Sequence, residues 1–219
     1  MTDPSVPPRF PGYDVLDKRQ TPSWDAVTRR VIDRRLAVPR EPGFFTPAEW
    51  ATADALCQRI LPQPASRPPV PLAALLDAKL LADWGDGFRE GDMPYMREAW
   101  RQGLAATEAE SLARHGGRHF SVLDTAEKDA LLGMMQRGEL SDPAWEGLGA
   151  KNFFTRRILS DVPDLYYSHP TAWSEMGFGG PASPRGYVRM ELDRRDPWEA
   201  AEAESGGEAK AVRENKHVV

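Results

Sequence analysis

The sequence predicts an all-α fold, and three features indicate it. Apolar residues recur at helical spacing in one segment after another, as in LAALLDAKLLADW over residues 72–84. Helix start signals precede several of these segments. No run of alternating β-branched residues is long enough to indicate a strand. We therefore expect a single helical domain of about six helices around one core. An extended N-terminal arm should precede it, and a loop rich in glycine, proline and aromatic residues should lead to a tail.

The expected organisation has three parts: an N-terminal arm with one helix over residues 1–42, a helical domain over 43–187 and a polar tail over 188–219. Prolines and polar groups over residues 1–22 indicate an extended arm. Ser23 is a plausible N-cap for the helix that follows. A narrow apolar stripe should face inward, formed by Val27, Val31, Ile32 and Leu36. The tail is highly charged, so we expect much of it to be mobile.

The clearest helix start lies at Thr46. Its side chain can cap, Pro47 suits the first helical position, and Glu49 completes a capping box. Asp124 and Glu127 repeat this signal further along the chain.

The remaining helices follow from apolar period and turn residues. The helical period over residues 72–84 places Trp84 on a buried face. A longer helix that includes MPYMREAW should end at Gly116 and Gly117. Asp142 and Pro143 should open a continuous helix reaching Pro163.

Composition excludes several classes of protein. Of 219 residues, 28% are charged and 41% hydrophobic, which is typical of soluble globular proteins. The net charge of −5 argues against nucleic-acid binding. No stretch approaches the length of about 20 apolar residues that a membrane span needs. The single cysteine, Cys57, lies in an apolar helical pattern and should be a buried structural thiol.

No common catalytic or cofactor motif is present, so we expect no catalytic, cofactor-binding or metal-binding residue in this chain. His115 and His119 are four residues apart, but glycines between them should break a shared helix face. Asp161, Asp164 and His169 lie close in sequence, without a defined geometry. The alternative to a non-catalytic role is a small metal-dependent enzyme that uses His115, His119 or His169.

The segment YYSHPTAWSEMGFGGPASPRGY, residues 166–187, is the least ordinary part of the sequence. Its glycines suggest a phosphate-binding loop, but the prolines after them disfavour the helix that such a loop needs. We expect a turn-rich loop whose aromatic residues either cover the domain's own core or anchor a protein partner. Both remain open. The candidate partner-binding residues are Tyr166, Tyr167, His169, Trp173, Phe178, Gly179, Gly180, Pro181, Arg185 and Tyr187.

Two blocks together resemble a known family. They are GFFTPAEWATADALCQRILPQ with PVPLAALLDAKL, and LYYSHPTAWSEMGFGGPASPRGY. The chain resembles the gluconate 2-dehydrogenase subunit 3 family over roughly residues 43–187. The resemblance implies a cofactor-free small subunit that stabilises, and helps to mature, a large flavoprotein subunit of the glucose-methanol-choline type. FAD and the activity then reside in that partner, and a cytochrome or another electron acceptor is a further candidate partner.

Many family members carry a twin-arginine export signal. Arg29 and Arg30 are followed by the charged run VIDRRLAVPR, and no such signal is recognisable. We expect a cytoplasmic protein, or a periplasmic one if its partner is exported with it. The preferred hypothesis is a non-catalytic subunit of a sugar or polyol dehydrogenase.

Overall fold

The computed structural model describes residues 8–65, 67–85, 87, 91–182, 184–186, 188, 195–196 and 198–217. Across these residues every regular element is a helix, which confirms the all-α prediction. The one β-type pairing described is an isolated bridge between Trp24 and Pro184. Tyr187 lies outside the described residues.

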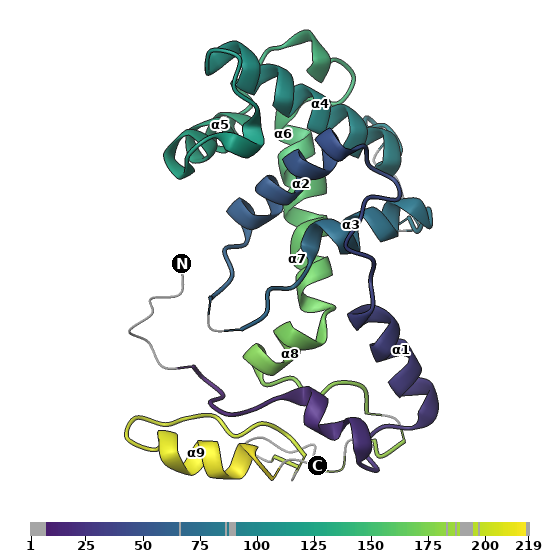
Figure 1. Ribbon diagram of the computed structural model, residues 1–219, viewed down its shortest axis with the longest axis vertical. Coiled ribbons are helices and arrows are strands. Elements are labelled where there is room, and N and C mark those ends of the chain that lie inside the picture. The colour runs from purple at the N-terminus through teal and green to yellow at the C-terminus, as the bar shows by residue number, and fades with distance from the viewer. Residues whose placement is uncertain are drawn as a thin grey trace. The chain divides into compact units, whose positions relative to one another are not determined.

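The chain folds as two compact units (Figure 1). The terminal unit comprises Met1–Val38, Pro64–Val70 and Tyr166–Val219, and the central unit comprises Pro39–Gln63 and Pro71–Leu165. The terminal unit thus contains both the N-terminal arm and the C-terminal tail. The domain limits expected near residues 42 and 187 stay a prediction.

The central unit is a helical assembly whose elements are α2 (Pro47–Ile60), α3 (Leu72–Leu81), α4 (Met96–Arg114), η2 (Phe120–Val122), α5 (Thr125–Arg137), η3 (Pro143–Trp145), α6 (Ala150–Asn152), the π-helical turn η4 (Phe153–Ile158) and α7 (Leu159–Tyr167). The last residues of α7 belong to the terminal unit. Gly103 lets α4 approach η4, because a Cβ there would lie 2.4 Å from the Phe153 ring. The Trp100 and Phe153 rings meet edge to face at 5.2 Å within this core.

The predicted capping boxes are confirmed. The Glu49 carboxylate accepts a hydrogen bond from the Thr46 N–H at 2.8 Å, and the Thr46 hydroxyl accepts one from the Glu49 N–H at 3.3 Å. The same reciprocal bonds join Asp124 and Glu127. These signals are local, so tertiary packing does not displace them.

Two helix predictions for the central unit are wrong. Helix α3 ends at Leu81, and Trp84 is 69% exposed rather than buried. The expected continuous helix after Asp142 is interrupted, because Gly147 and Gly149 adopt φ angles of 79° and 75°. Glycine tolerates this left-handed conformation, which a right-handed helix cannot contain.

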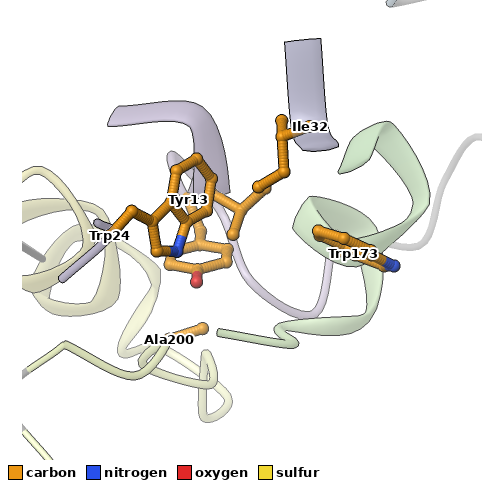
Figure 2. Packing of buried hydrophobic residues seen from close by; sticks show 6 residues of the cluster. Tyr13, Trp24, Ile32, Trp173 and Ala200 are labelled. Carbon is orange, nitrogen blue, oxygen red and sulfur yellow. The ribbon is translucent and has the colours of Figure 1, made fainter. Parts of the chain in front are cut away.

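The terminal unit contains η1 (Val15–Gln20), α1 (Ala26–Leu36), α8 (Pro170–Met176) and α9 (Glu208–Asn215). Its core joins both ends of the chain. Figure 2 shows Tyr13 and Trp24 side by side, with Ile32, Trp173 and Ala200 around them. This cluster places the N-terminal arm against the aromatic segment near residue 173.

Several predictions for the N-terminal arm are wrong. The arm is not wholly extended, because it contains η1, and the N-cap of α1 is Asp25 rather than Ser23. Val27 and Val31 are exposed, at 58% and 42%, so the predicted inward stripe is narrower than expected.

The tail, expected to be largely mobile, includes α9. The Asn215 side-chain amide donates hydrogen bonds to the carbonyls of Pro11 and Ala201, at 2.9 and 3.0 Å. Tertiary contacts therefore order a segment whose composition suggests mobility. Within the described residues, no helix is both long enough and apolar enough to cross a bilayer.

Candidate partner-binding site

The aromatic segment starts with a helix rather than a continuous loop. His169 precedes α8, and its Nδ1 accepts a hydrogen bond from the Thr171 N–H at 3.2 Å. Pro170 occupies the first helical position, where its missing N–H costs nothing. Gly177 ends the helix with φ of 71°. The expectation of irregular backbone throughout this segment was wrong, because a histidine N-cap and a glycine C-cap enclose a short helix.

The glycines after α8 allow the N-terminal arm to pack closely. A Cβ on Gly177 would lie 2.6 Å from the Phe10 ring. At Gly180, a Cβ would lie 3.1 Å from Trp24 and 3.2 Å from Val15. The arm's side chains thus fill the space that a phosphate would need. These glycines do not form the phosphate-binding loop considered from the sequence.

Lys18 is the central polar contact between the arm and this segment. Its side chain is fully buried, and Nζ donates to the Tyr13 hydroxyl at 3.0 Å and to the Gly179 carbonyl at 3.2 Å. Burial, together with the nearby Arg185 guanidinium, lowers the pKa of Lys18 to about 7. Burial also raises the pKa of Tyr13. The arm is thereby anchored by a lysine that is poorly suited to carry charge in this environment.

Arg185 also binds this chain's own backbone. Its guanidinium donates to the carbonyls of Ser23, Pro181 and Gly179, each at 3.3 Å, and lies 5.2 Å from the Trp198 ring. The fork of donors that suggested a partner contact therefore joins the arm, the glycine-rich turn and the tail.

Tyr166 lies in a polar cluster beside α8. Its hydroxyl contacts both the Glu175 carboxylate and the Arg67 guanidinium. Arg67 also donates to Glu175 at 2.6 Å and to the Thr171 carbonyl at 2.8 Å. Burial and the bond to Glu175 raise the pKa of Tyr166 to about 12. This residue holds the segment around Arg67 to α8.

Two predicted partner-binding residues remain substantially exposed. Tyr167 is 52% exposed and Phe178 is 40% exposed, and we call this pair the Trp173 face. The Phe178 ring meets Trp173 edge to face at 5.6 Å, and the Tyr167 carbonyl accepts a hydrogen bond from the Trp173 indole at 2.7 Å. Four of the other predicted residues are buried, namely Tyr166, His169, Trp173 and Gly180. Gly179, Pro181 and Arg185 are half-buried.

A second surface, in the central unit, was not anticipated from the sequence. A hollow of about 470 Å³ is lined by Phe44, Asp83, Tyr95, Arg97, Glu98 and Arg101. Tyr95 is 64% exposed, and Trp84 and Leu81, which lie close in sequence to the lining residue Asp83, are 69% and 55% exposed. One sequence signal for it is the run GDG directly after Trp84, which indicates that a loop begins close to this residue.

Comparison with known proteins identifies the family. The model of the family described as gluconate 2-dehydrogenase subunit 3 matches residues 47–180, which is more than half of the chain. The chain belongs to the gluconate 2-dehydrogenase subunit 3 family. The resemblance found in the sequence is therefore confirmed. The family name indicates a subunit of a dehydrogenase complex. No curated protein and no solved structure gives a match.

The family match clarifies the composition of the terminal unit. Most of the N-terminal arm and of the tail lie outside the matched residues 47–180, whereas α8 lies inside them. The arm and tail pack on the end of the family region, at Trp173 and Gly180. In this gluconate 2-dehydrogenase subunit 3 family member, flanking segments therefore cover much of the aromatic segment.

The histidines do not assemble a metal site. His115 Nδ1 lies 3.6 Å from the Glu127 carboxylate, and His119 contacts Glu108. His169 caps α8. Among the described residues, no group of three or more histidine, cysteine or acidic side chains could hold a metal ion.

Asp161 and Cys57, two other residues considered from the sequence, lie in the protein interior. Asp161 is buried, where its carboxylate accepts a hydrogen bond from the Trp100 indole at 2.7 Å and pairs with Lys79 at 3.2 Å. Cys57 is fully buried, as predicted, and burial raises the pKa of its thiol. Raising that pKa keeps the sulfur in its less reactive protonated form.

Proposed function

We propose that this chain is a non-catalytic small subunit that binds and stabilises the FAD-containing large subunit of a sugar or polyol dehydrogenase. The observation that carries the proposal is the family match over residues 47–180. Exposed aromatic side chains on both compact units support a binding role, because such groups bury large areas with little loss of conformational entropy.

In this proposal the large subunit, of the glucose-methanol-choline type, holds the flavin and oxidises the substrate. The glycine-rich turn of this chain does not fit a flavin pyrophosphate, because Phe10, Val15 and Trp24 occupy its surface. The small subunit would contribute a binding surface that stabilises the folded large subunit and assists its maturation. A cytochrome or another electron acceptor would be a further component. We place the complex in the cytoplasm, with co-export by the partner as the alternative.

Co-expression tests the proposal. The chain, carrying an affinity tag, is produced together with a flavoprotein large subunit of the glucose-methanol-choline type from the same genome. We expect a stable heteromeric complex that contains flavin and oxidises a sugar or polyol. The large subunit produced alone should give less soluble flavoprotein, because its binding surface is then uncovered.

Two results would contradict the proposal. One is recovery of this chain as a lone monomer beside a fully active large subunit. The other is an equal yield of flavin-loaded large subunit with and without it. Size-exclusion chromatography combined with flavin absorbance measures both.

A further inference from the structure

The hollow in the central unit is built around a fixed aromatic ring. The Asp77 carboxylate accepts hydrogen bonds from the N–H groups of Gly43 and Phe45 at 2.8 Å, and from that of Phe44 at 3.1 Å. These bonds fix the backbone that carries Phe44. The Phe44 side chain is buried, and its ring meets Phe45 edge to face at 5.3 Å.

Two arginines of α4 lie over this ring, and they differ in their hydrogen bonding. The Arg101 guanidinium lies 4.2 Å from the ring centroid, donates to the Phe44 carbonyl at 2.7 Å and pairs with Glu49 at 3.0 Å. The Arg97 guanidinium lies 5.0 Å from the same centroid, and its nearest carboxylate, Asp83, is 3.7 Å away. Within the described residues Arg97 makes no hydrogen bond, and its side chain is 43% exposed. Its planar set of donors thus forms an ion pair with Asp83 but makes no hydrogen bond in the described part of the chain.

Next to the lining residue Asp83, the chain presents large apolar groups on defined backbone. At the end of α3, the Asp83 N–H bonds to the Leu80 carbonyl and the Trp84 N–H to the Lys79 carbonyl, both at 3.2 Å. These two bonds form a Schellman motif, with Asp83 in the left-handed conformation at φ of 54°. The motif fixes the backbone at Trp84 while its indole stays exposed.

Tyr95 and Leu81 are held in a similar way. The Tyr95 N–H donates to the Glu98 carboxylate at 3.1 Å at the start of α4, yet the side chain is 64% exposed. Leu81 is 55% exposed and lies against Gly43, where a Cβ would be 2.9 Å from it. Exposed tryptophan and tyrosine beside an arginine is the composition that dominates binding energy at protein interfaces.

We propose that Leu81, Trp84, Tyr95 and Arg97, here called the Arg97 surface, dock the large subunit. The partner would present a carboxylate to Arg97, flanked by apolar groups that receive Trp84 and Tyr95. This inference rests on the proposed function and specifies where the partner binds.

The charges around Arg97 favour a protein carboxylate over a free anion. Asp83 and Glu98 also line the hollow and offset the attraction that the arginines exert on an isolated anion. When the carboxylate belongs to a protein, binding also buries Trp84 and Tyr95, which makes the binding free energy more favourable. The donors of Arg97, which make no hydrogen bond to any described residue of this chain, then provide specificity, and the apolar groups provide most of the affinity.

Affinity measurements on the co-expressed complex test the inference. Trp84→Ala and Arg97→Glu should each weaken binding of the large subunit by about tenfold or more. Arg97→Lys should recover only part of the affinity, because the ammonium keeps the charge and loses the planar fork. Arg137→Glu is the matched charge control, since Arg137 is exposed at the end of α5 and pairs with Glu139. It should bind within about twofold of wild type.

A photo-crosslinking residue in place of Trp84 gives a second readout. It should capture a large-subunit peptide that contains Asp or Glu. Circular dichroism should show unchanged helicity for each variant, because the replaced side chains are exposed.

Each outcome is decisive. If wild type forms no complex, both the proposed function and this inference fall. If wild type binds and the Trp84 and Arg97 variants bind equally well, only the docking surface is wrong. A larger loss from Phe178→Ala than from Trp84→Ala would move the interface to the Trp173 face. Loss with Arg97→Glu but none with Trp84→Ala would indicate long-range electrostatic steering and overturn the docking geometry.

Discussion

Trp173 in the terminal unit and Trp84 in the central unit are both large aromatic residues, and they differ in what covers them. In the terminal unit, Trp173 is 5% exposed because the N-terminal arm packs against it. In the central unit, Trp84 is 69% exposed at the end of α3. The sequence made Trp173 a candidate partner-binding residue, with core packing as the open alternative, and placed Trp84 in the core. Aromatic content alone therefore does not distinguish an interface from a core. Trp84 is exposed because α3 ends before it, and Trp173 is buried because the N-terminal arm covers it.

The largest expected effect concerns Trp173. Replacing it with alanine should lower the free energy of unfolding of the terminal unit by about 3–5 kcal/mol, because the change removes a buried ring and leaves a cavity. Hydrogen exchange of amides in α1 and α8 measures this loss. A change below about 1 kcal/mol would mean that Trp173 is not a core residue, and the contrast with Trp84 would disappear.

The second effect is a pH dependence through Lys18. Its pKa is about 7 when folded, against 10.5 ordinarily. Between these values the unfolded chain binds a proton that the folded chain does not, so stability rises with pH from about 7 to about 10.5 and is unaffected by this group below 7. The expected gain up to pH 9 is on the order of 2 kcal/mol.

The groups that face Lys18 set the conditions of this experiment. They are Tyr13, Arg185 and, at longer range, Glu199. The pKa of Tyr13 is raised in the folded chain, so the neutral phenol favours folding only below the ordinary tyrosine pKa near 10. Above that pH the loss of this contribution would obscure the effect of Lys18. The titration should therefore stop below pH 10. Lys18→Met should abolish the slope in hydrogen exchange of the arm. An unchanged slope in that variant would assign the effect to another group.

A smaller effect is expected at Gly177, where the arm contacts the glycine-rich turn. Gly177→Ala should destabilise the docked arm by about 1–3 kcal/mol, because the new methyl group meets the Phe10 ring and the backbone has φ of 71°. Gly186→Ala is the matched control, with the same φ of 71° and open space around its Cβ position. Limited proteolysis of the arm compares them. Equal effects would show that backbone conformation, not arm packing, requires the glycine.

The smallest effect on stability should come from Trp84→Ala. The exposed indole contributes little to folding, so the free energy of unfolding should change by less than about 0.5 kcal/mol. Chemical denaturation measures it. A loss above about 2 kcal/mol would mean that Trp84 packs against this chain, which would remove the basis for its proposed role in docking.

Local signals in the sequence predicted what local interactions determine. The capping box of Thr46 and Glu49 needs only residues three apart, and it forms as expected. The apolar helical pattern also predicted that Cys57 is buried, and it is fully buried. The same pattern failed at Trp84, because it continues past the Schellman motif that ends α3.

The remaining errors concern contacts between distant segments. Nothing near Gly177 in sequence indicates that Phe10 will cover it. Likewise, the charged composition of the tail gives no sign that Asn215 will bond to Pro11. The hollow needed Phe44, Asp83 and Arg97 to converge from separate segments, which no local pattern encodes.

The joining of arm and tail has a consequence for synthesis on the ribosome. Residues of the central unit run from 39 to 165, with a short interruption, so this unit can fold while translation continues. Trp24 and Tyr13 emerge first, but Trp173 and Ala200, with which they cluster, emerge last. During elongation the arm therefore stays undocked, and its apolar side chains remain uncovered until the rest of the terminal unit has been made. Closure of the terminal unit marks a chain whose translation has passed residue 200.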